Sequence, residues 1–359
     1  MKGNEAIAEA AIRAGCRLFF GYPITPSSEL AEYLARRMPE VGGTFLQAES
    51  EVAAINMVYG AAGSGARVMT ASSGPGISLK QEGLSYITGA ELPCVVVNIQ
   101  RAGPGLGGLG PSQGDYFQAT KGGGHGDYHP IVLGPASVQE AADLMMEAFD
   151  LADRWRLPVI LLGDGIIGQT MERVVFKEPS PVRTEKPWAT TGTGRRGPGA
   201  KRNIVQCWGL TPELLEPICL REQAKYEKIT AEEQRWDTFQ IEDAEALVVA
   251  FGTSARICRE AVMQLRAAGL KVGLLRPITL WPFPGKAFQS LPTSVRGVLA
   301  VELSMGQMVE DVRLAVNGRL PVRFFGRVGG FTPSPEDVAE RVVALLDEIP
   351  AKKAQGVTA

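Results

Sequence analysis

Residues 94–99, Cys-Val-Val-Val-Asn-Ile, form the stretch that decides the fold. An almost continuous apolar run of this length is typical of a strand buried on both faces of a parallel sheet. Similar runs predict further strands at residues 18–21, 68–71 and 158–162. Apolar residues at helical spacing fall between these runs, at residues 27–38, 50–62 and 137–154. Because strands and helices alternate, the sequence predicts an α/β layer fold.

The length of 359 residues favours two domains. Beyond residue 176 the apolar residues are no longer regularly spaced, and Pro, Gly, Thr, Lys and Arg predominate. A charged helix is then expected over residues 213–236. Further strands are predicted at residues 246–251, 272–275, 297–301 and 321–325, and further helices at residues 254–268, 307–317 and 335–346. We therefore expect two α/β domains with open parallel sheets, over residues 1–176 and 244–359, joined by a linker arm and charged helix over residues 177–243.

The composition argues against several classes of protein. A formal charge of -2 gives no reason to expect a nucleic-acid partner. The chain has no apolar run long enough to span a bilayer, and its first residues lack the apolar core of a signal peptide, so we expect a cytoplasmic protein without a membrane partner. The five cysteines are scattered and include no C-x-x-C pair, so we expect no metal site or iron–sulfur cluster on this chain.

Two glycine-rich stretches, residues 105–110 and 192–197, match the dinucleotide-binding pattern G-x-G-x-x-G. Neither lies between a strand and a helix, which the pattern requires, so an NAD-linked dehydrogenase is a weak alternative. Residues 163–165, Gly-Asp-Gly, could begin the motif with which thiamine enzymes bind magnesium and diphosphate. The asparagine pair that should follow is missing, because the next asparagine is Asn203, so an ordinary turn at a strand end is preferred.

Arg101 and Thr25 each follow a predicted strand, where α/β folds place ligand-binding groups. An arginine there could hold a carboxylate through two parallel hydrogen bonds, and a surface ion pair is the competing interpretation. Thr25 is also expected to cap the following helix, with Pro26 in the first turn. Glu49 and Glu51 begin the next helix, where the helix dipole alone could account for acidic residues.

Residues 121–129, Lys-Gly-Gly-Gly-His-Gly-Asp-Tyr-His, contain the only two histidines of the chain. Three consecutive glycines permit backbone shapes that other residues cannot adopt, so we expect a close-fitting active-site loop that includes Lys121, His125 and Asp127. The alternative is a metal site of His125, Asp127 and His129, which would lack the fixed geometry of a helix or strand.

In combination these segments resemble the alpha subunit of the 2-oxoacid:ferredoxin oxidoreductases, most closely the branched-chain (2-oxoisovalerate) type and next the 2-oxoglutarate type. The resemblance covers nearly the whole chain. It depends on the order and spacing of several motifs: Gly21-Tyr-Pro-Ile-Thr-Pro-Ser27, Glu49-Ser-Glu51, Thr70-Ala-Ser-Ser-Gly-Pro-Gly76, Gln100-Arg101 with the glycine-rich loop after it, Gln118–His129, Lys186-Pro-Trp-Ala-Thr-Thr-Gly192, Leu275–Pro284 and Val301-Glu-Leu-Ser-Met-Gly-Gln307.

The resemblance implies roles for individual residues. Glu51 resembles the catalytic glutamate that hydrogen-bonds N1′ of the aminopyrimidine of thiamine diphosphate, and Glu49 fits this role less well. Thr25 and Arg101 resemble the contacts to the substrate's carboxylate and keto oxygen. The remaining cofactor-binding positions by this resemblance are Tyr22, Pro23 and Ser73.

The resemblance also implies the domain types, cofactors and partners. The first domain would be the pyrimidine-binding domain and the second a transketolase C-terminal-like domain. A beta subunit would hold the diphosphate, Mg²⁺ and a [4Fe-4S] cluster, and gamma and ferredoxin-like delta subunits would complete a heteromeric complex that also contains further copies of this chain. The enzyme would decarboxylate a 2-oxoacid oxidatively with coenzyme A and ferredoxin. A non-catalytic scaffold subunit is the alternative, and it is distinguished by whether Glu51, Thr25 and Arg101 meet in one cleft.

Overall fold

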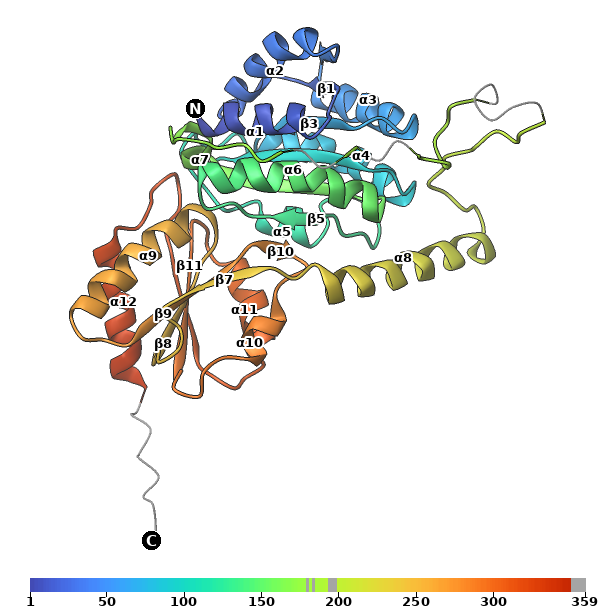
Figure 1. The fold of residues 1–359 in the computed structure, drawn as a ribbon. Helices are drawn as coiled ribbons and strands as arrows, with labels where there is room; N and C mark the ends of the chain where they lie inside the picture. Colours follow the sequence, from blue (N-terminus) through green and yellow to red (C-terminus); the bar gives the residue numbers. More distant parts are fainter. Residues whose placement is uncertain (179–180, 183–184, 193–198, 350–359) are drawn as a thin grey trace.

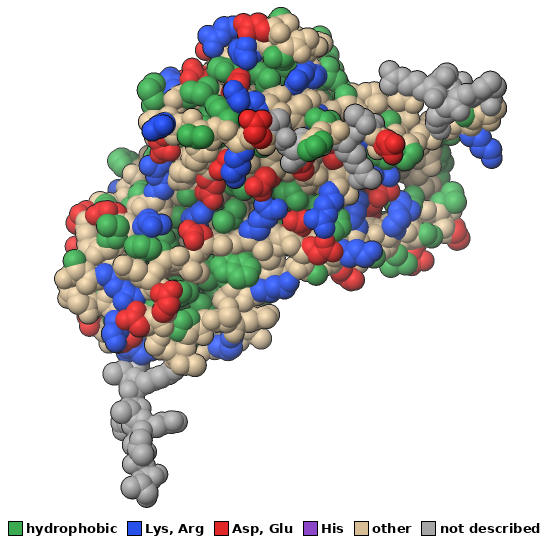
Figure 2. All heavy atoms as spheres, in the orientation of Figure 1, with side chains coloured by type: hydrophobic (Ala, Val, Ile, Leu, Met, Phe, Trp, Pro, Cys, Tyr) green, Lys and Arg blue, Asp and Glu red, His purple; other side chains and the backbone are tan. Residues whose placement is uncertain are grey.

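The computed structural model describes residues 1–178, 181–182, 185–192 and 199–349, which form two α/β units around two sheets (Figure 1). The larger sheet has seven strands in the order β10-β5-β6-β4-β3-β1-β2, and the smaller has five in the order β12-β11-β8-β9-β7. Both sheets are mainly parallel, which confirms the predicted fold class. Lys, Arg, Asp and Glu side chains are interspersed over the face seen in Figure 2. No helix in the described residues is long and apolar enough to cross a membrane.

The strands of the larger sheet confirm the four buried runs, each beginning at the predicted residue. They are β1 (Leu18–Gly21), β2 (Thr44–Gln47), β3 (Val68–Ser72), β4 (Cys94–Gln100), β5 (Ile131–Leu133), β6 (Pro158–Asp164) and β10 (Thr279–Trp281). Strand β4 pairs in parallel with β3 and β6, and all seven of its residues are buried. Its alternate side chains enter different cores, because Val95 and Val97 belong to one hydrophobic cluster and Cys94 and Val96 to the other.

The helices of the first unit lie on both faces of the larger sheet (Figure 1). They are α1 (Gly3–Arg13), α2 (Ser28–Glu40), α3 (Glu51–Gly63), α4 (Pro75–Gly89), α5 (Tyr116–Thr120), α6 (Val138–Trp155) and α7 (Gly165–Gln169). Helices α1, α2 and α6 share one hydrophobic cluster, whereas α3 and α4 share the other. The predicted N-cap at Ser137 is confirmed, since its hydroxyl accepts a hydrogen bond from the Glu140 N–H at 3.1 Å.

Thr25 does not cap the second helix, and that prediction was wrong. Helix α2 begins at Ser28 with Ser27 as the preceding residue. Both the backbone N–H and the hydroxyl of Ser27 donate to the carbonyl of Ile24, at 3.0 and 2.8 Å. This closes a turn over residues 24–27, so Thr25 and Pro26 lie within the turn and before the first helical residue.

The second unit follows the long helix α8, which projects from the body of the molecule (Figure 1). Helix α8 spans Pro212–Glu232, and the elements of the second unit are β7 (Trp236–Phe239), β8 (Ala246–Val249), α9 (Gly252–Ala267), β9 (Val272–Pro277), α10 (Gly285–Gln289), β11 (Gly297–Glu302), α11 (Met308–Val316), β12 (Val322–Gly326) and α12 (Pro335–Glu348). Strand β7 pairs antiparallel with β9, and β10 leaves this unit to pair antiparallel with β5 of the larger sheet. The second unit therefore contributes a strand to the sheet of the first.

Buried polar side chains join the two units. The Gln113 side chain is fully buried, and its amide N–H₂ donates to the Phe251 carbonyl at 2.8 Å. Its amide oxygen accepts from the Ser254 hydroxyl at 2.8 Å and from the Leu303 N–H at 2.9 Å. Nearby, Asp164 accepts from the Thr253 hydroxyl at 2.9 Å. Each of these groups has its hydrogen-bond partner on the opposite unit, so separating the units would leave several buried groups unpaired.

Replacing Gln113 with leucine is predicted to destabilise the chain by about 2–5 kcal/mol, because three buried partners lose their hydrogen bonds at once. Urea unfolding of the purified chain, followed by tryptophan fluorescence, measures this change. The control is Gln264→Leu at an exposed position of α9, where a change within about 0.5 kcal/mol is expected. Equal effects of the two substitutions would contradict the role of Gln113.

Candidate active site

Four neighbouring strands of the larger sheet end at the predicted site residues. The order β4-β3-β1-β2 places the carboxyl ends of these parallel strands side by side. Arg101 follows β4 and Ser73 follows β3, whereas residues 22–25 follow β1 and Glu51 lies just beyond β2 at the start of α3. In α/β sheets this edge is where ligands bind. The fold therefore brings all of these positions to one edge of the sheet.

The turn between β3 and α4, residues 72–76, lies between two of the charged side chains. A Cβ atom on Gly76 would come within 2.5 Å of Glu51 Oε1 and 2.2 Å of Ser72 Oγ. A Cβ atom on Gly74 would lie 3.3 Å from Arg101 Nε, and the φ of Gly74 is +46°. Both positions therefore require glycine, one for space and the other also for its backbone conformation.

Arg101 and Thr25 are in direct contact. The Arg101 Nη1 group donates to the Thr25 carbonyl at 2.9 Å, and Nη2 donates to the Leu106 carbonyl at 3.1 Å. Arg101 is only 7% exposed, and its Nε has no hydrogen-bond partner in the described part of the chain. Two carbonyls thus hold the guanidinium in place and leave its buried Nε–H without a partner.

A pocket of about 290 Å³ lies beside Arg101. Its lining residues are Gly74, Pro75, Ser78, Arg101, Ala102, Gly103, Pro104, Gly105 and Asp115. Burial raises the pKa of Asp115, opposed by its hydrogen bond from Asn98 and by the charge of Arg101. The pocket is large enough for a small organic acid and offers one cation to it.

Glu51 is buried, and its carboxylate accepts no hydrogen bond from the residues that the structure describes. The hydroxyls of Ser72 and Ser73 are also buried and have no partner within the described ranges. Glu49, by contrast, is exposed, as are Tyr22 and Pro23 on the loop after β1. The site therefore contains two hydroxyls that are removed from water without a hydrogen-bond partner, beside the carboxylate of a residue that is 6% exposed, which is typical of a place where a ligand binds.

Lys80, on α4, is a member of this cluster that sequence reasoning missed. It is fully buried, and its Nζ donates to Thr70 Oγ1 at 3.2 Å. Burial lowers the pKa of Lys80 to about 8, opposed by the negative charge of Glu51. The spacing could have revealed it, because Lys80 lies three residues after Ile77 and four before Leu84, on the apolar stripe of the helix.

The loop of residues 121–129 packs against α4. The Tyr128 hydroxyl accepts from the Gly124 N–H at 2.9 Å, and it contacts Gln81 Oε1 at 3.3 Å. Lys121 forms an ion pair with Asp311 of the second unit. His125 and Asp127 are exposed. The loop thus lies beside the cluster, but its charged side chains are not directed into it by any described hydrogen bond.

The alternative of a metal site in this loop finds no support in its geometry. The His129 ring stacks on Trp281 with 4.8 Å between ring centroids, and its Nδ1 lies 3.2 Å from the Thr120 carbonyl. Burial lowers the pKa of His129. Within the described ranges, no group of three His, Cys, Asp or Glu side chains is placed to hold a metal ion. The glycine-rich stretch of residues 105–110 opens no helix, and residues 193–197 of the second stretch lie outside the described residues.

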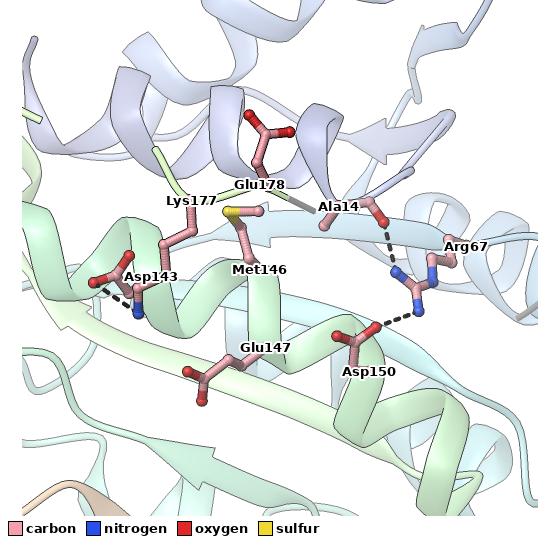
Figure 3. A pocket seen from close by; sticks show the side chains of 8 residues that line it. All are labelled: Ala14, Arg67, Asp143, Met146, Glu147, Asp150, Lys177 and Glu178. Carbon is pink, nitrogen blue, oxygen red and sulfur yellow. Dashed lines mark hydrogen bonds and ion pairs between the residues drawn. The ribbon is translucent and has the colours of Figure 1, made fainter. Parts of the chain in front are cut away.

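A second pocket lies near the amino ends of the strands, between α6 and the segment that follows α7 (Figure 3). There Arg67, which precedes β3, donates to the Ala14 carbonyl and forms ion pairs with Asp150 and Asp153. Each charged nitrogen of Arg67 therefore has a partner, as expected for a structural ion-pair network. The unpaired polar atoms at the carboxyl ends make that edge the better candidate for chemistry.

Comparison with known protein families matches two regions of the chain. Residues 9–201 match the family described as pyruvate flavodoxin/ferredoxin oxidoreductase, thiamine diphosphate-binding. Residues 244–338 match core domain II of pyruvate:ferredoxin oxidoreductase.

Similar proteins of known name cover nearly the whole chain. Ketoisovalerate oxidoreductase subunit VorB of Methanothermobacter thermautotrophicus is 50% identical over 95% of this chain and 96% of its own length. The 2-oxoglutarate synthase subunit KorA of Methanocaldococcus jannaschii is 38% identical over 96% of this chain and 98% of its own length.

Two solved structures are similar in fold. One is a 2-oxoglutarate:ferredoxin oxidoreductase of Magnetococcus marinus with 2-oxoglutarate, coenzyme A and succinyl-CoA bound, with a TM-score of 0.84 and 29% identity. The match covers 96% of this chain and 64% of that longer chain. A split-gene transketolase, with a TM-score of 0.62 and 13% identity, shares the fold alone. From these matches, this chain belongs to the thiamine diphosphate-dependent 2-oxoacid:ferredoxin oxidoreductase family.

Proposed function

We propose that this chain is the subunit that binds the aminopyrimidine of thiamine diphosphate and the carboxylate of a 2-oxoacid. The observation that carries the proposal is the arrangement around the β3–α4 turn, where Glu51 meets Gly76 and Arg101 meets Gly74. Arg101 also contacts Thr25. This convergence on one edge of the sheet favours a catalytic subunit over a scaffold without catalytic residues.

The residues present fit the aminopyrimidine half of the cofactor. Glu51 is 6% exposed and its carboxylate has no described hydrogen bond, whereas the Ser73 hydroxyl is fully buried and has no partner in the described residues. Tyr22 and Pro23 are exposed on the adjoining loop and would contact the ring. When bound, thiamine diphosphate supplies the nucleophilic carbon and the electron sink for decarboxylation. Glu51 would accept a hydrogen bond from N1′ and so set the protonation of the ring.

Arg101 would orient the substrate. Its guanidinium is held by two carbonyls, so it is preorganised, and the buried Nε remains free for a carboxylate in the adjoining pocket. Thr25 lies against it and would contact the same substrate. Lys121, His125 and Asp127 lie on the loop beside α4, and we propose that this loop closes the site when the ligands are bound.

The relatives support the substrate class and the need for partners. They carry the names ketoisovalerate oxidoreductase subunit and 2-oxoglutarate synthase subunit. We propose a branched-chain 2-oxoacid as substrate, with coenzyme A as acyl acceptor and ferredoxin as electron acceptor. Mg²⁺, the diphosphate and a [4Fe-4S] cluster would be held by a beta subunit, with gamma and ferredoxin-like delta subunits in the complex. A cytoplasmic location stays a prediction.

Glu51→Gln is predicted to lower turnover of the assembled complex by at least about 100-fold, because an amide supports proton transfer at N1′ poorly. Steady-state assay with a 2-oxoacid, coenzyme A and a viologen dye measures it. Glu49→Gln is the matched control, since Glu49 is exposed two residues earlier. A loss with Glu49→Gln but not with Glu51→Gln would move the role to Glu49.

Arg101→Lys is predicted to lower kcat/KM for the oxoacid by roughly 10- to 1000-fold, equivalent to about 1.4–4 kcal/mol. Lysine carries the charge but cannot form two parallel hydrogen bonds or replace both carbonyl contacts. The affinity for thiamine diphosphate should stay unchanged. Arg256→Lys, in a partly exposed ion pair with Glu172, is the control. Unchanged oxoacid kinetics with weakened cofactor binding would show that Arg101 is structural.

The substrate assignment predicts a higher kcat/KM for 2-oxoisovalerate than for 2-oxoglutarate. The pocket beside Arg101 offers one described cation and also contains Asp115, so a second carboxylate would gain no ion pair there. Parallel assays of the native complex with the two oxoacids decide between them. Preference for 2-oxoglutarate would assign the chain to the other branch of the family without changing the roles of Glu51 and Arg101.

A further inference from the structure

Three cations are buried in the described part of the chain, and two of them, Arg101 and Lys80, form no ion pair with a described residue. Arg67 has the carboxylates of Asp150 and Asp153 and the Ala14 carbonyl around its guanidinium, and Figure 3 shows the contacts to Asp150 and Ala14. Arg101 has two carbonyls. Lys80 is the most buried of the three, yet its ammonium group donates only to the neutral hydroxyl of Thr70 among the described residues. An ammonium group removed from water is unfavourable unless a negative charge lies close by.

The fold places Glu51 close to this ammonium group. Lys80 lies four residues after Gly76, so the two positions are one turn apart on the same face of α4. Glu51 Oε1 approaches Gly76 to within 2.5 Å of where its Cβ would be. Thr70 and Ser72 lie on one face of β3, and they contact Lys80 and the same Gly76 position respectively. The carboxylate on α3 and the ammonium on α4 therefore meet one polar patch of β3.

We propose that Lys80 is a positioning residue for Glu51, and that its ammonium group supplies the countercharge that holds the carboxylate in place toward the aminopyrimidine. The inference rests on the proposed function, because it takes Glu51 as the group that contacts the cofactor. Lys80 itself touches neither cofactor nor substrate. It acts through the charge that it holds behind the carboxylate.

The other charged groups around Glu51 do not replace Lys80 in this role. Strands β1 and β3 contain no ionisable side chain. Arg101 faces Gly74 on the other side of the turn and is held there by two carbonyls. Glu49 is exposed and has the same charge as Glu51. Lys80, unlike Arg101, is a buried cation on the same side of the β3–α4 turn as the Glu51 carboxylate.

The position of Lys80 makes cofactor binding sensitive to pH in a range where carboxylates do not titrate. Burial lowers the pKa of Lys80 to about 8, below its ordinary value of 10.5. Below that pH the ammonium form balances Glu51. Above it the lysine becomes neutral, and the carboxylate loses its countercharge. Affinity for thiamine diphosphate should therefore fall as the pH rises through about 8.

The test is calorimetric titration of thiamine diphosphate into the apo complex between pH 7 and pH 10, for wild type and for Lys80→Met and Lys80→Arg. Wild type should lose affinity on the alkaline side. Lys80→Met should bind roughly tenfold more weakly at pH 7 and show no alkaline loss, since a shift of one pKa unit corresponds to a factor of about ten. Lys80→Arg should keep the affinity to higher pH, because guanidinium stays protonated.

The same titration in a Glu51→Gln background shows whether Lys80 acts through Glu51. There Lys80→Met should change the affinity by less than about twofold, because the interaction is already removed. Lys186→Met is the control for loss of a partly buried lysine, since Lys186 pairs with Asp153 away from the site. It should leave the pH dependence as in wild type.

Several outcomes would overturn the proposal. Wild-type affinity in Lys80→Met, or an equal effect of Lys80→Met with and without Glu51, would show that Lys80 does not act through Glu51. If Lys80→Met does not assemble, Lys80→Arg still tests the proposal. Equal loss of affinity for thiamine diphosphate at alkaline pH in Lys80→Arg and wild type would also show that Lys80 does not act through Glu51. Unchanged affinity in Glu51→Gln alone would instead contradict the proposed function, so the two failures are distinguishable.

Discussion

The close approach of the β3–α4 turn to two charged side chains is the constraint on which the candidate site depends. A side chain at Gly76 would overlap the Glu51 carboxylate, and one at Gly74 would press on Arg101. The turn can pass between them only because both positions lack a Cβ atom. The strand order β4-β3-β1-β2 then determines which further residues reach this place, since each of these strands ends beside it.

Much of this architecture could be predicted from local sequence. Strands such as β3 and β4 are buried on both faces, so their apolar runs are distinctive, and Ser137 is a strong helix-starting signal. The short strands β2, β5, β7 and β10 were missed. Strand β2 is a partly exposed edge, and β10 pairs with β5 from far along the chain. Thr25 was misjudged as a cap because a turn over residues 24–27 delays the helix.

The positions of the candidate site that follow strands could be predicted from the sequence. Contacts between side chains from distant segments could not. Arg101 and Glu51 could be placed because the carboxyl ends of parallel strands meet at one edge. Gln113 gave no such signal, because its partner Phe251 lies 138 residues away. Asp164 was recognised at a strand end, but not its contact with Thr253, which lies 89 residues away. Lys80 could have been noticed, because it is a cation on an apolar helical stripe. The role proposed for it depends on the Glu51 carboxylate, which comes from another helix.

The exchange of β10 between units also determines where the chain can be divided. A fragment that ended before residue 244 would lack β10, and β5, with its three buried apolar residues, would become the edge of the sheet. Uncovered apolar edges invite pairing between molecules. The remaining fragment would in turn carry Phe251, Ser254 and Leu303 without the amide that pairs them. The sequence pattern divides the chain into two units, but each unit covers groups that the other would expose if it were produced alone. If the chain were divided at this boundary, the two fragments would have to reassemble.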